Sequence, residues 1–521
     1  MSKEPGSPDN RLRRATIGDV LERRSLRDPH MPALVVNLED CHRLELTYGQ
    51  LDSSANQMAR LMEGMGVGHG DVVATMARNG LDHVVSYYAA LKLGAVFSTI
   101  NPASTVTELD RQLESSSPSI IVAEASVTHK LLNTDVQVIV TESASDAAIP
   151  GSLLAEAIAP YSSIRVDRWV DETDLAMIIY TSGTESEPKG VRIPHRNFLL
   201  STSPAWITER YVEPDDRFLL AAPMYTMAGV GTVTNLIAVG ATIVMSVSLS
   251  PDVVLNIITR ERITNMSQTP TFYHRLIDAD EFSSSNLASL RQAHTYGGAI
   301  PETVVDAMGH RSPQLMWATY WGQTELSQLG SIGYYKDRSQ IPGQDPRWVG
   351  RPVPQVEVQV VDENDAPTQV GELICRSPSV MDGYHKLPKL TESVLRGGWL
   401  RTGDIVRIDA DQNLFFEDRK KDIIKSGGMN VSSLEVEGVL SRLRGIREAA
   451  VVGVPDPKWS EAVTAFLVAD GHPPTIDEVL FEARAHLAPY KVPKQVHFVS
   501  ALPRDAQGKV VKRALRGSQP E

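Results

Sequence analysis

The chain has 521 residues, more than one hydrophobic core normally serves, so at least two folded units are expected. Its hydrophobic content of 42% is ordinary for a globular protein, and its formal net charge of −13 argues against a nucleic-acid partner, because phosphate backbones attract basic surfaces. The two cysteines, Cys41 and Cys375, are too few for a disulfide framework or a cysteine zinc site and fit a reducing cytoplasm.

Neither a signal peptide nor a membrane span is expected. The first 14 residues are polar and lack the apolar run of a signal peptide, and we expect them to fray. Residues 218–251 carry no charged side chain, which is unusual outside membrane segments. Pro223, three glycines and many Ser and Thr residues interrupt this run, and its β-branched stretches favour buried strands of a two-sided sheet.

The first part of the chain alternates between helix and strand patterns. Residues 46–64 show apolar positions at helical spacing, and a strand-like run at residues 71–74 is followed by a helix that ends at Gly94. Two more strand-like runs lie at residues 119–123 and 136–140. Strands that alternate with helices predict parallel sheets covered by helices on both faces.

A stretch rich in hydroxyl groups and glycine follows the apolar run 177–180. Here Lys189 supplies a positive charge, and the backbone N–H groups and hydroxyls before it can bind an anionic oxygen. These residues are Thr181, Ser182, Gly183 and Thr184. Lys189 is followed by glycine rather than Ser or Thr, so this is not a Walker A loop. The alternative is an ordinary polar surface turn.

Further strands are expected at residues 217–222, before a turn into a buried helix, and near residue 294, before the paired glycines Gly297 and Gly298. Glycines at that place let a flat ligand approach the backbone, although ordinary turns also contain them. The apolar run 315–318 then leads toward Thr324 and Glu325. A carboxylate directly after a hydroxyl at a strand end suits a Mg²⁺ ion that also contacts phosphate oxygens.

The pattern changes near residue 353, where short alternating strands predict a small antiparallel unit. Thr402, Gly403 and Asp404 precede a predicted hairpin, and the charged run 418–425 is interpreted as a hinge between domains. Beyond the hinge, the sequence predicts a compact α+β unit with helices at 434–443 and 476–487 and strands at 449–454 and 465–468.

Five segments together resemble, in the same order, motifs of the adenylate-forming superfamily, which comprises acyl-CoA synthetases, nonribosomal adenylation domains and luciferases. The segments are residues 180–191, 321–325, 402–404, 418–437 and 503–513, within a similarity that extends from about residue 44 to residue 516. The resemblance implies an α/β fold with a large N-terminal domain at residues 1–418. This domain would contain two αβ-layered sheets and a small antiparallel β-barrel. A small mobile α+β lid would follow at residues 419–521, with its hinge at Lys421.

The implied reaction joins a carboxylic acid to the thiol of CoA through an acyl-adenylate, with ATP and Mg²⁺. Lys509, from the small domain, would stabilise the charge that develops at the α-phosphate, where Thr324 would also bind. Glu325 and Thr184 would hold the Mg²⁺, and Gly427 and Gly428 would line the passage of the pantetheine thiol. The other implied nucleotide-binding residues are Thr181, Ser182, Gly183, Lys189, Gly297, Gly298, Ala299, Trp321 (where the family usually has tyrosine), Gly322, Asp404 and Arg419.

The substrate pocket is implied at Tyr225, Thr226, Val230, Tyr296 and Gln323. Thr226 stands where related synthetases often carry histidine, so a bulky apolar acid would fit, unless a neighbouring side chain fills the space. The segment 224–227 contains no carboxylate for a substrate ammonium group, which disfavours α-amino acids.

The phosphate loop departs from the family at Glu185 and Ser186, where a hydroxyl residue and glycine are usual. Because Glu185 adds negative charge near a triphosphate, we expect that replacing both residues with the family types leaves ATP binding as tight or tighter. Two alternatives remain open: an enzyme that loads a carrier protein, and a ligand-binding relative without catalysis. The chain is expected to be a monomer or a homodimer.

Overall fold

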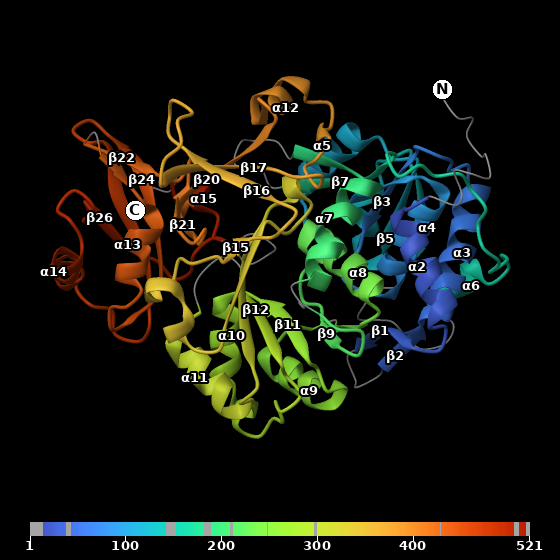
Figure 1. Ribbon diagram of the computed structural model, residues 1–521, viewed down its shortest axis with the longest axis horizontal. Helices are drawn as coiled ribbons and strands as arrows, with labels where there is room; N and C mark the ends of the chain where they lie inside the picture. The colour runs from blue at the N-terminus through green and yellow to red at the C-terminus, as the bar shows by residue number, and fades with distance from the viewer. Residues whose placement is uncertain are drawn as a thin grey trace. The chain divides into compact units, whose positions relative to one another are not determined.

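The computed structural model describes residues 14–37, 43–141, 153–181, 189–208, 212–246, 248–295, 300–427, 429–504 and 510–516. The chain divides into two compact units. The first comprises Met1–Glu357 and Arg376–Leu400, and the second comprises Val358–Cys375 and Arg401–Glu521. Figure 1 shows the elements of both units along the chain.

A seven-stranded sheet of the first unit carries the predicted phosphate loop. Its strand order is β18 (Gly383–Tyr384), β8 (Lys189–Pro194), β7 (Leu175–Thr181), β4 (Val96–Thr99), β3 (Val72–Met76), β5 (Ile120–Glu124) and β6 (Gln137–Thr141). The strands from β7 to β6 run parallel, as the alternating pattern predicts. At the other edge, β8 and β18 are antiparallel to their neighbours, which the prediction of parallel sheets did not anticipate.

The periodicity predicts two of the helices in this part of the chain, α3 (Tyr48–Gly64) and α4 (Leu81–Leu93). The others are α2 (Ile17–Arg27), α5 (Val106–Ser116), α6 (Leu153–Ile158) and α7 (His195–Thr208). Thr47 and Gln50 form a capping box at the start of α3, which satisfies free backbone N–H groups there. α4 ends at Gly94, whose φ of 74° is the left-handed conformation that glycine adopts most easily.

The second large sheet of this unit has nine strands. Their order is β15 (Arg351–Pro352), β14 (Ser331–Tyr335), β13 (Met316–Trp321), β12 (Gln292–Thr295), β11 (Asn265–Gln268), β9 (Arg217–Leu219), β10 (Thr242–Ser246), β1 (Pro32–Asn37) and β2 (Arg43–Thr47). The six strands from β13 to β1 are parallel, and antiparallel strands again form the edges. The last residue of β13 is Trp321, three residues beyond the apolar run 315–318.

The charge-free segment folds as strand, buried helix and strand. β9 and β10 flank α8 (Met227–Val239), and nearly every residue of this helix is buried. The remaining helices of the unit are α9 (Pro251–Glu261), α10 (Pro270–Ile277) and α11 (Glu302–Arg311), which lie along β11 and β12 (Figure 1), and α12 (Pro388–Val394). Across the described residues, no helix combines the length and apolarity needed to cross a bilayer.

A five-stranded antiparallel sheet follows and resembles half of a barrel. It contains β16 (Glu357–Val361), β17 (Val370–Arg376), β20 (Trp399–Ile408), β19 (Leu395–Arg396) and β21 (Leu414–Arg419). Residues 402–404 lie inside β20, so the prediction that they precede the hairpin was wrong. Most of this sheet falls in the second unit. A domain boundary after residue 418 stays a prediction.

The C-terminal part of the second unit is the expected compact α+β fold. Its sheet contains β22 (Ile424–Ser426), β23 (Met429–Val431), β24 (Ile446–Asp456), β25 (Ser460–Ala469) and β26 (Gln495–Phe498). The helices are α13 (Ser433–Leu440), α14 (Ile476–His486) and α15 (Lys512–Arg516). Val436 and Val479 pack with Val451 and Val463 in one core, while Phe466 and Leu515 belong to a second core. Side chains that alternate along β24 and β25 thus fill two separate cores.

Candidate active site

The predicted phosphate loop connects two paired strands of the first unit. β7 ends at Thr181 and β8 begins at Lys189, and these two residues face each other in the antiparallel register. The Thr181 hydroxyl donates to the Lys189 carbonyl oxygen, 3.5 Å away. The strand pair therefore fixes both ends of the loop. The loop residues Ser182, Gly183, Thr184, Glu185 and Ser186 lie outside the described residues.

Three segments that are distant in sequence meet beside this hairpin. The hydroxyl of Tyr384, on β18, donates a hydrogen bond to Glu325 Oε1 at 2.9 Å. The ammonium group of Lys189 lies 5.9 Å from the centroid of the same tyrosine ring, within range of a cation–π interaction. Burial, together with the charge and hydrogen bond of Glu325, raises the pKa of Tyr384, so its phenol remains a proton donor.

The loop after β13 presents Thr324 and Glu325 on a short 3₁₀ turn, Thr324–Leu326. Gly330 N donates to the carbonyl oxygen of Trp321 at 2.9 Å and closes the loop. A Cβ on Gly322 would lie 1.6 Å from the carbonyl oxygen of Gln328, so only glycine fits at this position. This compactness holds the hydroxyl and the carboxylate at the end of the strand.

Trp321 is 6% exposed, and its ring packs against Gly330, where a Cβ would lie 2.2 Å from the indole. Its stacking on an adenine stays a prediction. Gln323 is half-buried, and its Nε2 has no hydrogen-bond partner within the described part of the chain. A buried amide donor without a partner is suited to an oxygen of a ligand. Gln323 is therefore compatible with the implied acyl pocket.

The implied acyl pocket lies at the start of α8. Thr226 is the N-cap of this helix: its hydroxyl accepts from Gly229 N at 3.3 Å and donates to Pro223 O at 2.8 Å. Val230, one turn later, is fully buried, and Tyr225 is half-buried. Thr226 thus has a structural role that histidine at the same position does not share. Tyr296 lies outside the described residues.

Asn79 positions the turn that precedes this helix. Its Nδ2 donates to Ala222 O at 2.9 Å, and its Oδ1 accepts from Met224 N at 2.7 Å. On the other side of the turn, the Thr99 hydroxyl donates to Tyr225 O at 3.0 Å. Asn79, shortly after β3, and Thr99, at the end of β4, therefore fix the backbone of the turn before α8.

A magnesium ion is implied by the motifs, and the residues present are suited to it. Within the described ranges, no three His, Cys, Asp or Glu side chains cluster to hold a metal by themselves. Glu325 offers one carboxylate beside the Thr324 hydroxyl. Mg²⁺ typically takes one or two protein carboxylates and completes its coordination with phosphate oxygens and water. This donor set is appropriate for a magnesium ion that arrives with a nucleotide.

In the second unit, Asp404 and Arg419 face each other on β20 and β21. Asp404 is fully buried, and its Oδ1 lies 2.8 Å from Arg419 Nη1. The Thr402 hydroxyl accepts a hydrogen bond from Asp404 N at 3.1 Å and so helps to fix the strand backbone. The pair implied to hold a ribose is thus preformed as a cross-strand ion pair.

The predicted hinge and thiol passage also belong to the second unit. Arg516, on α15, pairs with Asp422 at 2.8 Å and donates to the Lys421 carbonyl oxygen at 3.3 Å. Gly427 has φ of 60°, and a Cβ there would lie 3.1 Å from the Trp459 ring, so both conformation and space favour glycine. Gly428 and Lys509 lie outside the described residues, as do Gly297, Gly298 and Ala299.

Three residues of this region were missed in the sequence: Tyr384, Asn79 and Gln328. The positions of Asn79 and Tyr384 follow from strand pairing and packing between distant segments. Only Gln328 lies close to a recognised motif. Its Nε2 donates to the Thr232 hydroxyl of α8 at 3.1 Å, and nothing in its residue type indicated this contact. Local pattern therefore could not identify any of the three.

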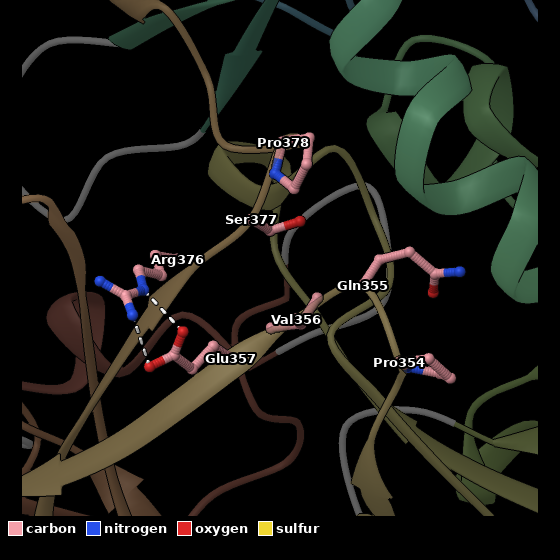
Figure 2. A pocket seen from close by; sticks show the side chains of 7 residues that line it. All are labelled: Pro354, Gln355, Val356, Glu357, Arg376, Ser377 and Pro378. Carbon is pink, nitrogen blue, oxygen red and sulfur yellow. Dashed lines mark hydrogen bonds and ion pairs between the residues drawn. The ribbon is translucent and has the colours of Figure 1, made fainter.

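One hollow on the first unit is separate from these residues. It has a volume of about 530 Å³ and is lined by residues 354–357 and 376–378 (Figure 2). Arg376 pairs with Glu357 through two contacts of 2.6 and 2.9 Å and also stacks on the Trp399 ring. Its charged groups are thus already paired, and the hollow contains none of the candidate site residues.

Comparison with known proteins assigns the same regions to one family. The model of the AMP-binding enzyme family matches residues 21–385, and the model of the AMP-binding enzyme C-terminal domain matches residues 435–509. The first match contains Lys189, Glu325 and Tyr384.

Individual relatives match over nearly their whole length. The chain is 30% identical to feruloyl-CoA synthase from an Amycolatopsis species over 97% of this chain and 99% of that protein. It is 29% identical to a long-chain-fatty-acid–CoA ligase from Mycobacterium tuberculosis over 96% of this chain and 98% of the ligase. Among solved structures, ATP-bound MatB from Rhodopseudomonas palustris matches with a TM-score of 0.84 and 27% identity, over 96% of this chain and 98% of that one.

Proposed function

Because this chain belongs to the AMP-binding enzyme family, we propose that it is an AMP-forming ligase that joins a bulky apolar carboxylic acid to coenzyme A. The acid would be an aryl, cyclic or fatty acid. The observation that supports the proposal most is the meeting of Lys189, Tyr384 and Glu325 beside the phosphate-loop hairpin. These groups supply positive charge and a carboxylate where a nucleotide triphosphate needs them.

In the first half-reaction, a carboxylate oxygen of the acid attacks the α-phosphorus of ATP, and the bond to pyrophosphate breaks. Lys189 offsets the negative charge of the phosphates, and Thr324 donates to an α-phosphate oxygen. Mg²⁺ held by Glu325 would add positive charge along the phosphates. Lys509 would stabilise the charge that grows in the transition state.

In the second half-reaction, the thiol sulfur of CoA attacks the acyl carbon, the bond to AMP breaks, and the thiol proton passes to solvent. Gly427 and Gly428 are proposed to line the approach of the thiol. The family resemblance assigns Asp404 and Arg419 to the ribose of the nucleotide. A carboxylate is suited to that role because it accepts hydrogen bonds from two neighbouring hydroxyls.

The acid class is inferred from the surroundings of α8. Met227 and Val230 are buried and apolar, and Thr226 has its hydroxyl engaged in capping the helix. An α-amino acid would place an ammonium group where residues 224–227 offer no carboxylate. Feruloyl-CoA synthase and the long-chain-fatty-acid–CoA ligase among the relatives carry bulky, largely apolar acids in their names.

The test is a panel of acids with ATP, Mg²⁺ and CoA, in which AMP and the acyl-CoA product are quantified by mass spectrometry. The panel includes acetate, propionate, aryl acids, medium-chain and long-chain fatty acids, and phenylalanine as an amino-acid control. We expect the highest kcat/KM for an aryl, cyclic or fatty acid and no product from phenylalanine. Acetate or propionate as the best substrate would contradict the assignment of a bulky acid.

The acceptor is tested with the best acid of the panel. CoA and a phosphopantetheinylated carrier protein are offered separately at equal concentration. Transfer to CoA with little transfer to the carrier supports the proposal. The reverse result would identify a carrier-loading enzyme, and a failure to consume ATP with every acid would indicate a ligand-binding relative.

A further inference from the structure

Residues 379–385, called here the bridging segment, connect to the loop that carries Glu325. Ser327 Oγ donates to Ser379 O at 2.6 Å, and Met381 N donates to Glu325 O at 2.8 Å. The backbone of Glu325 is therefore bound to this segment independently of its side chain.

The other end of the bridging segment is bound to the strand that begins at Lys189. β18 pairs antiparallel with β8, Asp382 N donates to Arg192 O at 2.9 Å, and His385 N donates to Gly190 O at 2.7 Å. One short segment thus joins the end of the phosphate loop on one sheet to the end of strand β13 on the other.

Tyr384 is the side chain of this segment that contacts both functional groups. Its hydroxyl donates a hydrogen bond to Glu325 Oε1, which orients the carboxylate. The ammonium group of Lys189 lies over the face of its ring. Hydrogen bonds to an ionised acceptor are stronger than neutral ones, and a cation over a tyrosine ring adds a further contribution.

We propose that Tyr384 is a positioning residue for adenylation, which aligns the Glu325 carboxylate for Mg²⁺ and holds Lys189 toward the phosphates of ATP. This inference rests on the proposed function. The phenol itself transfers no proton in this role.

Two substitutions separate the two contacts of Tyr384. Tyr384→Phe removes the hydrogen bond to Glu325 and keeps the ring, whereas Tyr384→Leu removes both contacts. We expect Tyr384→Phe to weaken binding of Mg²⁺·ATP about tenfold, the size of one hydrogen bond to a charged group. Tyr384→Leu should weaken it about a further threefold through loss of the ring. Isothermal titration calorimetry without acid or CoA measures this affinity independently of turnover.

Two controls make the result specific. Tyr48→Phe removes another buried hydroxyl, at the first residue of α3, which donates to Ala241 O at 2.8 Å; this substitution should leave the affinity unchanged. In a Glu325→Ala background, which has no side-chain acceptor for the Tyr384 hydroxyl, Tyr384→Phe should change the affinity less than about twofold, because the two substitutions act through one contact. Thermal unfolding of each variant confirms that the fold is retained.

Unchanged Mg²⁺·ATP affinity in Tyr384→Phe would overturn the inference while leaving the proposed function intact. An equal loss in the wild-type and the Glu325→Ala backgrounds would also overturn it, because the tyrosine would then act through another group. If the wild-type protein failed to bind Mg²⁺·ATP, both the inference and the proposed function would be wrong.

Discussion

Gln328 donates a hydrogen bond from Nε2 to the hydroxyl of Thr232 on α8, at 3.1 Å. The same amide contacts Ala228 O at 3.4 Å, and its Oε1 accepts from Asn235 Nδ2 at 3.2 Å. Gln328 adopts φ of 110°, which residues with a side chain seldom do. Strained backbone of this kind persists only where surrounding contacts hold it. The loop after β13 is thereby fastened to the helix of the implied acyl pocket.

Replacing Gln328 should separate the contribution of its side chain from that of its backbone. Gln328→Ala loses the three polar contacts and keeps the strained φ, so we expect its free energy of unfolding to fall by about 1–3 kcal/mol. Gln328→Gly loses the same contacts but relieves the strain, and should be more stable than the alanine variant by about 1 kcal/mol. Urea unfolding measures both values. A glycine variant less stable than the alanine variant would show that the backbone is not strained.

Asn79 should affect the acid more than the nucleotide. Asn79→Ala leaves Ala222 O and Met224 N without their side-chain partner and loosens the turn before α8. We expect KM for the acid to rise about tenfold, with KM for ATP unchanged within about twofold. Asn79→Asp keeps the acceptor for Met224 N, so its KM for the acid should lie between those of the wild-type protein and Asn79→Ala. An equal rise in KM for ATP would mean that Asn79 supports the whole unit instead of the pocket.

His195 should make the folded protein sensitive to mild acid. Its Nδ1 accepts a hydrogen bond from Ile17 N at 3.2 Å, and burial lowers the pKa of His195 to about 4, from the ordinary 6.5. Between these values the unfolded chain binds a proton that the folded chain does not, so stability falls as the pH falls.

The corresponding variant is His195→Gln, which can accept the same hydrogen bond but does not titrate. From pH 7 to pH 5, the wild-type protein should lose about 2 kcal/mol more of its free energy of unfolding than the variant. Denaturant unfolding at both pH values gives this difference. Equal losses in the two proteins would show that His195 can be protonated in the folded state.

Substitutions of Arg419 test whether the Asp404–Arg419 ion pair, proposed to bind the ribose, supports both stability and ATP binding. Arg419→Met leaves the buried Asp404 carboxylate without its cation, and we expect a loss of about 2 kcal/mol in the free energy of unfolding together with weaker ATP binding. Arg419→Lys retains the charge but not the planar group and should lose less stability. If neither variant changed ATP affinity, the assignment of this pair to the nucleotide would be wrong.

Much of the fold could be predicted because its signals are local. The end of α4 at Gly94 and the compact α+β unit at the C-terminal end follow from residue type and periodicity. The antiparallel edges did not follow, since the direction of β8 depends on the return of the phosphate loop and that of β18 on pairing between distant segments. For the same reason, residues 402–404 were placed before a strand and are found inside it.

The candidate site likewise contains residues that local motifs indicate and residues that only tertiary contacts bring together. Lys189, Thr324 and Glu325 could be proposed from the sequence because they lie in short motifs whose composition suits phosphate and magnesium. Tyr384 contacts two of them, yet it follows Glu325 by 59 residues and Lys189 by a longer interval, and no local pattern marks it. Asn79 acts on a turn more than 140 residues away in the chain. Contacts of this range are set by tertiary packing, which a single sequence does not display.

The most direct test of the proposed activity is acid-dependent exchange of labelled pyrophosphate into ATP, because it detects the acyl-adenylate without any thiol acceptor. We predict exchange that requires both Mg²⁺ and an aryl, cyclic or fatty acid, and that falls about a hundredfold or more in Lys509→Ala. An absence of exchange by the wild-type protein with every acid of the panel would contradict the account.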